Sequence, residues 1–242
     1  MSFIIEFSIL AVLVVVHSVF GLGLLLFGTP TFLLLGYDFA NTLNILMPVS
    51  IMISGLQFFK SESKDKNFVS NYNLYCLPFL ALFLILALSM GDKVDFKLFV
   101  ALLLFFTSIV VLNKNEFKFF ANKLLKFKKI ILIVIGSLHG FSNMGGSFLS
   151  LYSSLLSKNK KELTRYYISY GYLTMGIIQY LIVLIISYKS LDFSKLYYTL
   201  IAIILYYPAQ KIFLDIDNKK FSKYVNILAL LYGVIIILSY LY

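Results

Sequence analysis

The chain has 242 residues, of which 60% are hydrophobic and 13% are charged, and its formal net charge is +10. A soluble domain is about half apolar and about one quarter charged, so this composition excludes a soluble globular protein and indicates a polytopic α-helical membrane protein. Because the lysines lie between apolar runs, we attribute the positive charge to membrane topology and expect no nucleic-acid partner.

The first half, residues 1–112, begins with an apolar segment that is interrupted by His17 and two glycines. The tripeptide Gly28-Thr29-Pro30 predicts a second break, before an apolar continuation to Gly36. Three apolar spans are expected next, with a polar loop at 61–71 and a turn at Gly91-Asp92-Lys93; the spans cover about 39–59, 74–90 and 97–112.

Residues 113–129 connect the two halves and carry six lysines. Their large apolar residues recur at helical spacing, at Phe117, Phe120, Leu124 and Phe127. This pattern predicts an amphipathic helix that lies on an anionic membrane surface.

The second half, residues 130–242, repeats the order of elements in the first. A broken segment runs to about Ser157, the basic loop Lys158–Lys161 follows, and spans are expected at about 166–188, 196–214 (with a break at Pro208) and 224–241. A shift of 122 residues pairs the following residues: His17 with His139, Gly23 with Gly145, Thr42 with Thr164, and Gln57 with Gln179. We therefore predict one membrane domain, 1–242, built from two internal repeats, and we expect the two glutamines to make hydrogen bonds between helices.

The distribution of Lys and Arg residues distinguishes two topologies. If all eight apolar segments cross the membrane, the two sides receive 11 and 10 of these residues, and the usual cytoplasmic excess is missing. If each broken segment is a re-entrant hairpin that enters and leaves on one side, the two sides receive 17 and 4. The second arrangement restores the excess, so we predict two inverted repeats, each a hairpin plus three transmembrane helices, with both chain termini outside the cytoplasm.

The two hairpin tips are the predicted substrate site. A tip inside the bilayer needs its backbone groups satisfied by protein or water, and the half-helix that leaves it presents unpaired N–H groups to an anion. The residues assigned to the tips are Gly21, Gly23, Asn143, Gly145, Gly146 and Ser147. Close packing of helices at small residues is the alternative role for the glycines.

His17 and His139, the only two histidines, stand just before these glycines. We interpret them as substrate-contacting residues and proton-coupling candidates, because histidine titrates near physiological pH. A satisfied hydrogen bond between helices is the alternative. No metal site is expected, because the single cysteine, Cys76, and the acidic residues are not near either histidine in the sequence.

Further candidates open the spans that follow the hairpins. Arg165, the only arginine, is a candidate for gathering an oxyanion at the inner mouth, and an interfacial anchor beside Lys160 and Lys161 is its alternative. Asn41, Thr42 and Thr164 are either substrate-site residues or helix starts. The tyrosines after Arg165, including Tyr172, are assigned to the aromatic belt at the membrane surface.

These motifs together resemble the sulfite exporter TauE/SafE family of membrane transporters. The resemblance is carried by Gly21-Leu22-Gly23, Pro30, Leu33-Leu34-Leu35-Gly36 and Ala40-Asn41-Thr42, and in the second half by His139-Gly140, Gly145-Gly146, Lys158–Lys161 and Thr164-Arg165. The chain departs from the family at Leu24-Leu25-Leu26, where members often have glycines, and it lacks the several cysteines of thiosulfate-uptake relatives. The resemblance implies movement of a small sulfur-containing anion across the cytoplasmic membrane.

We therefore expect a secondary transporter in the cell inner membrane that moves sulfite or an organosulfonate, coupled to protons through the histidines. It would need no cofactor, and assembly as a homodimer is left open. A non-transporting membrane subunit or scaffold is the main alternative. An intramembrane enzyme is the least favoured one, because the chain has no HExxH motif, no GxSxG elbow and no acidic pair.

Overall fold

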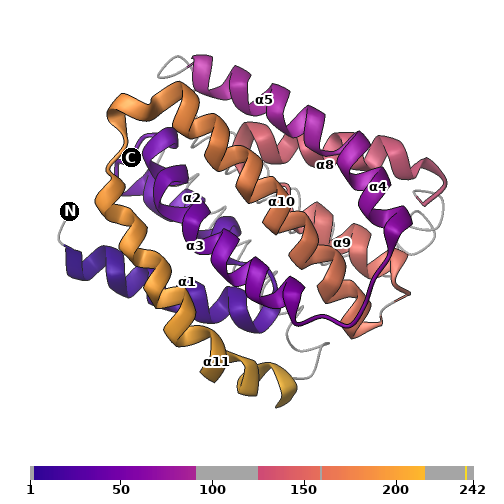
Figure 1. Ribbon diagram of the computed structural model, residues 1–242. Helices are drawn as coiled ribbons and strands as arrows, with labels where there is room; N and C mark the ends of the chain where they lie inside the picture. Colours follow the sequence, from indigo (N-terminus) through magenta and orange to yellow (C-terminus); the bar gives the residue numbers. More distant parts are fainter. Residues whose placement is uncertain (1–2, 91–124, 159, 216–237, 239–242) are drawn as a thin grey trace.

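The computed structural model describes residues 3–90, 125–158, 160–215 and 238, and in these ranges every regular element is a helix (Figure 1). The first half contains α1 (Phe3–Phe20), α2 (Leu24–Leu34), α3 (Phe39–Phe59), α4 (Lys66–Tyr75) and α5 (Leu77–Met90). The second half contains α8 (Lys128–Ser142), α9 (Gly146–Leu156), α10 (Lys161–Ser187) and α11 (Thr199–Asp215). Short 3-10 helices are η2 (Leu125–Phe127), η3 (Tyr188–Ser190) and η4 (Phe193–Tyr198).

Three helical stretches are long and apolar enough to cross a membrane: Phe39–Phe59, Lys66–Met90 and Glu162–Ser187. The expectation of an all-helical fold is therefore confirmed for the described residues, and these three stretches are consistent with a membrane protein by length and composition. The span expected at 196–214 is not among them. The predicted spans at 97–112 and 224–241, the turn at residues 91–93 and most of the connecting segment 113–129 lie outside the described residues.

Each half begins with two helices separated by a short break. Between α1 and α2, Gly21 has φ +73° and Gly23 has φ +128°, and only glycine adopts such positive values at no steric cost. Between α8 and α9, Asn143 has φ +62° and its backbone N–H donates to the carbonyl of His139. Asparagine is one of the few other residues that tolerate this left-handed conformation, which ends a helix.

The break expected at Gly28-Thr29-Pro30 is wrong, because α2 continues through Pro30. A methyl group built on Gly28 would lie 2.8 Å from Leu46 Cδ2 of α3. Gly28 thus permits a close approach of α2 to α3 and forms no turn. The break expected at Pro208 is also absent, since α11 runs through that residue to Asp215. Pro30 is buried, so packing against neighbouring helices offsets the backbone hydrogen bond that it removes; Pro208 is exposed.

Helix boundaries elsewhere agree with the sequence in part. The expected span at 39–59 coincides with α3, whereas the predicted loop at 61–71 is half helical, because α4 begins at Lys66. The Asp65 carboxylate caps this helix by accepting a hydrogen bond of 3.0 Å from the Phe68 backbone N–H. The span predicted at 166–188 is the larger part of α10, which starts five residues earlier, at Lys161.

Two helices from different halves, α3 and α10, lie side by side at the centre (Figure 1). Side chains of each helix pack on a glycine of the other: Ile51 on Gly176, and Leu173 on Gly55. On one flank α5 packs against α8, and on the other flank α1 packs against α11. Each flank therefore pairs a helix of the first half with a helix of the second.

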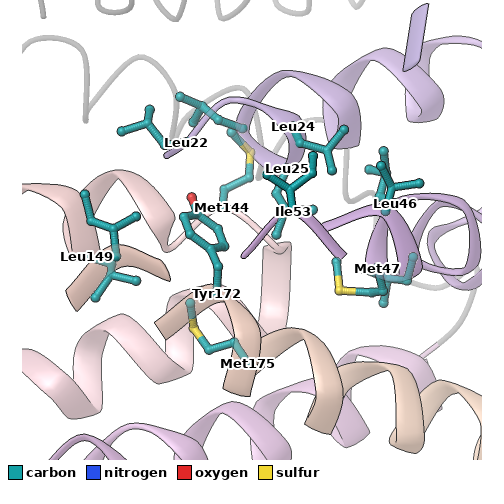
Figure 2. Packing of buried hydrophobic residues seen from close by; sticks show 14 of the residues in the cluster. Leu22, Leu24, Leu25, Leu46, Met47, Ile53, Met144, Leu149, Tyr172 and Met175 are labelled. Atoms are coloured by element: carbon teal, nitrogen blue, oxygen red, sulfur yellow. The ribbon is translucent and has the colours of Figure 1, made fainter. Parts of the chain in front are cut away.

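The buried core includes the place where the two breaks meet. Leu22 belongs to the first break and Met144 to the second, and both are buried. Figure 2 shows them in one cluster with Tyr172 of α10, whose hydroxyl is directed toward these two residues. The packing of α2 against α9 is consistent with this convergence of the breaks.

Candidate functional site

Both histidines lie at this centre. His17 is in the last turn of α1, His139 is in the last turn of α8, and both side chains are fully buried. The two rings meet the same aromatic ring edge to face: their centroids lie 5.3 Å (His17) and 6.0 Å (His139) from the centroid of Tyr172. Histidines that are 122 positions apart in the sequence thus share one neighbour.

Neither histidine has a hydrogen-bond partner for its ring nitrogens among the described residues. For His17 the predicted alternative, a satisfied hydrogen bond between helices, is therefore not seen in this part of the chain, whereas the side chain of Gln179 lies near the His139 ring and interacts with it. Burying such a polar group without a partner is costly. Other buried polar side chains also lack partners among the described residues, but these two rings share one tyrosine, and their nitrogens can supply N–H donors or acceptors to a bound group.

The carbonyl groups of the histidines are held in the same way in both halves. The side-chain amide of Gln57 donates to the carbonyl of His17 at 3.4 Å and to that of Ser18 at 3.3 Å. The amide of Gln179 donates to the carbonyl of His139 at 3.5 Å. The predicted interhelical role of both glutamines is confirmed, and each fixes the helix end that carries a histidine.

The second break is the more polar of the two. The amide of Asn143 donates to the Thr29 hydroxyl of α2 at 2.9 Å, and its Oδ1 atom has no partner among the described residues. The Ser147 hydroxyl donates to the carbonyl of Met144 at 3.4 Å. Gly145 packs on His139, and a methyl group built on Gly146 would lie 1.6 Å from the hydroxyl oxygen of Tyr172. The N-terminus of α9 therefore faces Tyr172 and lies close to the histidines.

The first break presents mainly apolar groups. Gly23 precedes α2 and makes no side-chain cap, and a methyl group on it would lie 2.7 Å from Val16. Gly21 faces Ile168 of α10 at 3.5 Å by the same measure. These two glycines serve the turn itself, so the polar groups near the centre come mostly from the second half.

Arg165 is connected to the end of α1 that carries His17. Its guanidinium donates to the Gln210 side chain of α11 at 2.5 Å, and the amide of Gln210 donates to the carbonyl of Ser18 at 2.9 Å. Arg165 lies seven residues before Tyr172, which is about two helical turns along α10 and on the same face. The arginine is thus half-buried beside the first break, not an exposed anchor among lysines.

Three sequence candidates are not brought to the histidines. Asn41 stands at the start of α3 and bonds to Asp38, the residue that caps this helix. Thr164 makes hydrogen bonds with Ser157 and with the carbonyl of Lys160 at the start of α10. Thr42 is buried, but it lies 15 residues before Gln57, about 22 Å along α3. The geometry of these residues fits helix starts better than a central site.

A buried carboxylate ties the elements at the other end of α1. Glu6 is 1% exposed, and it accepts hydrogen bonds from the hydroxyls of Tyr37 and Tyr198 and from the ammonium of Lys195, the last at 2.6 Å. Sequence reasoning did not single out Glu6 for this role. A lone acidic residue in an apolar run is the signal that could have found it, since such a group needs partners when buried.

A second polar cluster joins α10 to α4 and to Asp65, the residue before α4. The Tyr167 hydroxyl donates to the Asp65 carboxylate at 2.6 Å, and the Tyr170 hydroxyl donates to Asn73 at 2.7 Å. Partial burial acts to raise the pKa of Asp65, but hydrogen bonds from Tyr167 and from backbone N–H groups outweigh it, so the pKa lies below its ordinary value. These tyrosines join chain segments and are not a simple membrane belt.

The structure also has a surface hollow of about 460 Å³ that is lined by Lys60, Ser61, Glu62, Ser63 and Glu162. It does not include the histidines, which are enclosed. Within the described ranges no three His, Cys, Asp or Glu residues are grouped as metal ligands.

Tyr172 is the central residue that sequence reasoning missed. It is 1% exposed in the middle of α10 and contacts both histidines and the start of α9. Its position among other tyrosines in the sequence gave no sign of this role.

Comparison of the chain with models of protein families, with curated protein sequences and with solved structures finds no match in any of the three.

Proposed function

We propose that this protein is a secondary transporter of a small anion, and that the anion binds where the two breaks meet. One observation carries the proposal: His17 and His139, from opposite halves of the chain, lie fully buried against Tyr172 with unpartnered ring nitrogens, beside the N-terminus of α9. Buried polar groups at the ends of broken helices are typical of transporter sites in membranes.

The chemistry of the site favours an anion. Backbone N–H groups at a helix N-terminus are donors with a positive dipole end. Neutral imidazole rings add one donor each, and the Tyr172 hydroxyl adds another. Sulfite and organosulfonates, the substrates that the resemblance to the TauE/SafE family implies, present several oxygen acceptors to such a set of donors. Protonation of a histidine would neutralise the anion, which gives a route to proton coupling.

The proposal includes two inverted repeats, and the helix arrangement supports it. A shift of 122 residues carries α2 (Leu24–Leu34) onto α9 (Gly146–Leu156) and the first residue of α3 onto that of α10. The same shift relates α1 to α8 and α5 to α11. The contact of α1 with α11 on one flank therefore corresponds to the contact of α8 with α5 on the other. The paired glutamines on the histidine carbonyls follow the same correspondence.

Inverted repeats provide a mechanism by which a central site can open to either side of the membrane. Two halves of like structure and opposite orientation can exchange conformations, which opens the central site first to one side of the membrane and then to the other. Both histidines are fully buried, which fits an enclosed stage of such a cycle. We place the protein in the cell inner membrane with both termini outside and the lysine-rich loops in the cytoplasm.

The test is uptake of labelled sulfite into liposomes that contain the purified full-length protein, with and without a pH gradient. We expect gradient-dependent uptake that excess unlabelled sulfite suppresses and that a protonophore reduces. Empty liposomes under the same gradient are the control.

Uptake no higher than in empty liposomes would remove sulfite as the substrate. A panel of organosulfonates, thiosulfate and carboxylates then decides between another anion and no transport. Failure with the whole panel would favour the non-transporting subunit, which copurification with a stable partner would identify.

A further inference from the structure

We infer that Tyr172 closes the anion site and sets the size of anion that the site accepts; this inference rests on the transport function proposed above. Three observations lead to it: the position of Tyr172 along α10, its contacts with both histidines, and the absence of any space between its hydroxyl and Gly146.

Tyr172 lies near the middle of a helix that can cross the membrane. The crossing stretch is Glu162–Ser187, so Tyr172 stands about 15 Å from one end and about 22 Å from the other, at 1.5 Å per residue. A tyrosine at this depth is far from the headgroup region, where the polar end of the side chain ordinarily lies. Its hydroxyl must therefore be directed to polar groups inside the protein.

The groups of the proposed anion site surround the ring and the hydroxyl of Tyr172. The rings of His17 and His139 both meet the Tyr172 ring edge to face. The hydroxyl oxygen lies over Gly146, the first residue of α9, so closely that an added methyl group would be 1.6 Å from it and 2.4 Å from Cζ. Figure 2 shows the ring reaching from α10 toward Met144 and Leu22, which belong to the two breaks.

The tyrosine thus stands where an anion at the N-terminus of α9 would bind, between the backbone N–H groups and the two imidazole rings. Substrate and side chain cannot occupy this position together, so the ring must turn aside when the anion enters. After that movement its hydroxyl can donate a hydrogen bond to the anion, and its ring limits the room that remains. A small oxyanion fits this arrangement, and a sulfonate with a bulky organic group is excluded.

The placement of Tyr172 can be tested without transport. Gly146→Ala puts a methyl group against the hydroxyl, so we expect a lower melting temperature of the detergent-solubilised protein. In a Tyr172→Ala background the same glycine substitution should cost little, because the opposing atoms are gone, and the two effects should be strongly non-additive. Additive effects would show that the two residues are not in contact and would overturn the inference.

Selectivity is tested in the liposome assay with labelled sulfite and three unlabelled competitors of increasing size: methanesulfonate, 2-aminoethanesulfonate and benzenesulfonate. For Tyr172→Ala we expect benzenesulfonate to inhibit at a concentration at least about tenfold lower than in the parent protein. The reason is that its phenyl ring can then enter the site and bury apolar surface there.

For Tyr172→Phe we expect the KM for sulfite to rise about tenfold, because one hydrogen bond to a charged group is lost, and we expect the order of the competitors by size to stay unchanged.

Tyr170→Phe is the matched control. It removes a tyrosine hydroxyl from the same helix, one that bonds to Asn73 away from the histidines, and it should leave the size order unchanged. An unchanged size order in a folded Tyr172→Ala protein, or an unchanged KM in Tyr172→Phe if the alanine variant does not fold, overturns the inference while transport itself stands. If the parent protein moves none of these anions, the proposed function fails and this inference fails with it.

Discussion

At the scale of single residues, the two buried histidines differ from Glu6, the buried carboxylate of α1. Glu6 is surrounded by a lysine and two tyrosine hydroxyls that satisfy its carboxylate. His17 and His139 have no such partners for their ring nitrogens among the described residues. A carboxylate with satisfied oxygens holds helices together, whereas an unpartnered imidazole is available to a substrate or a proton.

This difference leads to a prediction for His139, which stands beside the polar break. Replacement of His139 by alanine should reduce the pH dependence of sulfite uptake between pH 5.5 and pH 7.5, because the proposed proton-coupling group is lost. The measurement is the initial uptake rate into liposomes at each pH, at equal protein content. The matched variant His17→Ala, beside the apolar break, shows which histidine sets the coupling. Unchanged pH dependence in His139→Ala would remove its coupling role.

At the scale of elements, the crossing of α8 with α4 and α5 depends on two glycines. Gly136 and Gly140 are four residues apart, so they lie on one face of α8. Methyl groups built on them would lie 2.2 Å from the carbonyl oxygen of Cys76 and 2.3 Å from that of Leu80. Those carbonyls are also four residues apart. The two backbones therefore stay in contact over more than one helical turn. Small residues permit this approach in membranes, where interhelical packing drives association.

Gly140→Ala should therefore lower the free energy of unfolding by about 1–3 kcal/mol, the usual cost of overpacking. The melting temperature of the protein in detergent is the measurement. Val134→Leu is the control on the same helix, because Val134 is 43% exposed and has room for the added carbon. Equal melting temperatures for the two variants would show that the backbones do not approach as closely as described.

At the scale of the whole molecule, helices of the two halves are intertwined. The α1 helix packs against α11 and the α5 helix packs against α8, so neither half forms its flank alone. The two polar clusters, around Glu6 and around Asp65, join segments that are far apart in the sequence. In the proposed topology these clusters lie toward opposite sides of the membrane.

The topology predicts which loops meet the cytoplasm. Ser63→Cys lies in a lysine-rich loop and Lys189→Cys in one of the loops with few lysines. In intact cells a membrane-impermeant maleimide should label Lys189→Cys and not Ser63→Cys, and permeabilised cells should give label at both. The parent protein is the background control, because its single cysteine is buried. Labelling of both positions from the same side would contradict the inverted arrangement.

Properties that depend on the chemistry of a segment by itself followed from the sequence. The apolar composition, the limits of α3 at Phe39–Phe59 and the breaks at Gly21–Gly23 and Gly145 were predicted. The 122-residue correspondence also predicted that Gln57 and Gln179 would be used alike. These features follow from the sequence because a helix in a bilayer is mostly apolar, so that a polar residue or a break within it stands out.

Only the tertiary structure decided which residues meet. Pro30 stays inside α2, where neighbouring helices bury it, and α11 runs through the exposed Pro208. Lys195 reaches Glu6 across 189 positions, Asn143 reaches Thr29, and both histidines reach Tyr172. These contacts depend on how rigid helices cross, and the pattern of residues along one helix does not specify its rotation against another. The centre of the molecule, and with it the role of Tyr172, is therefore a property of the packed helices together.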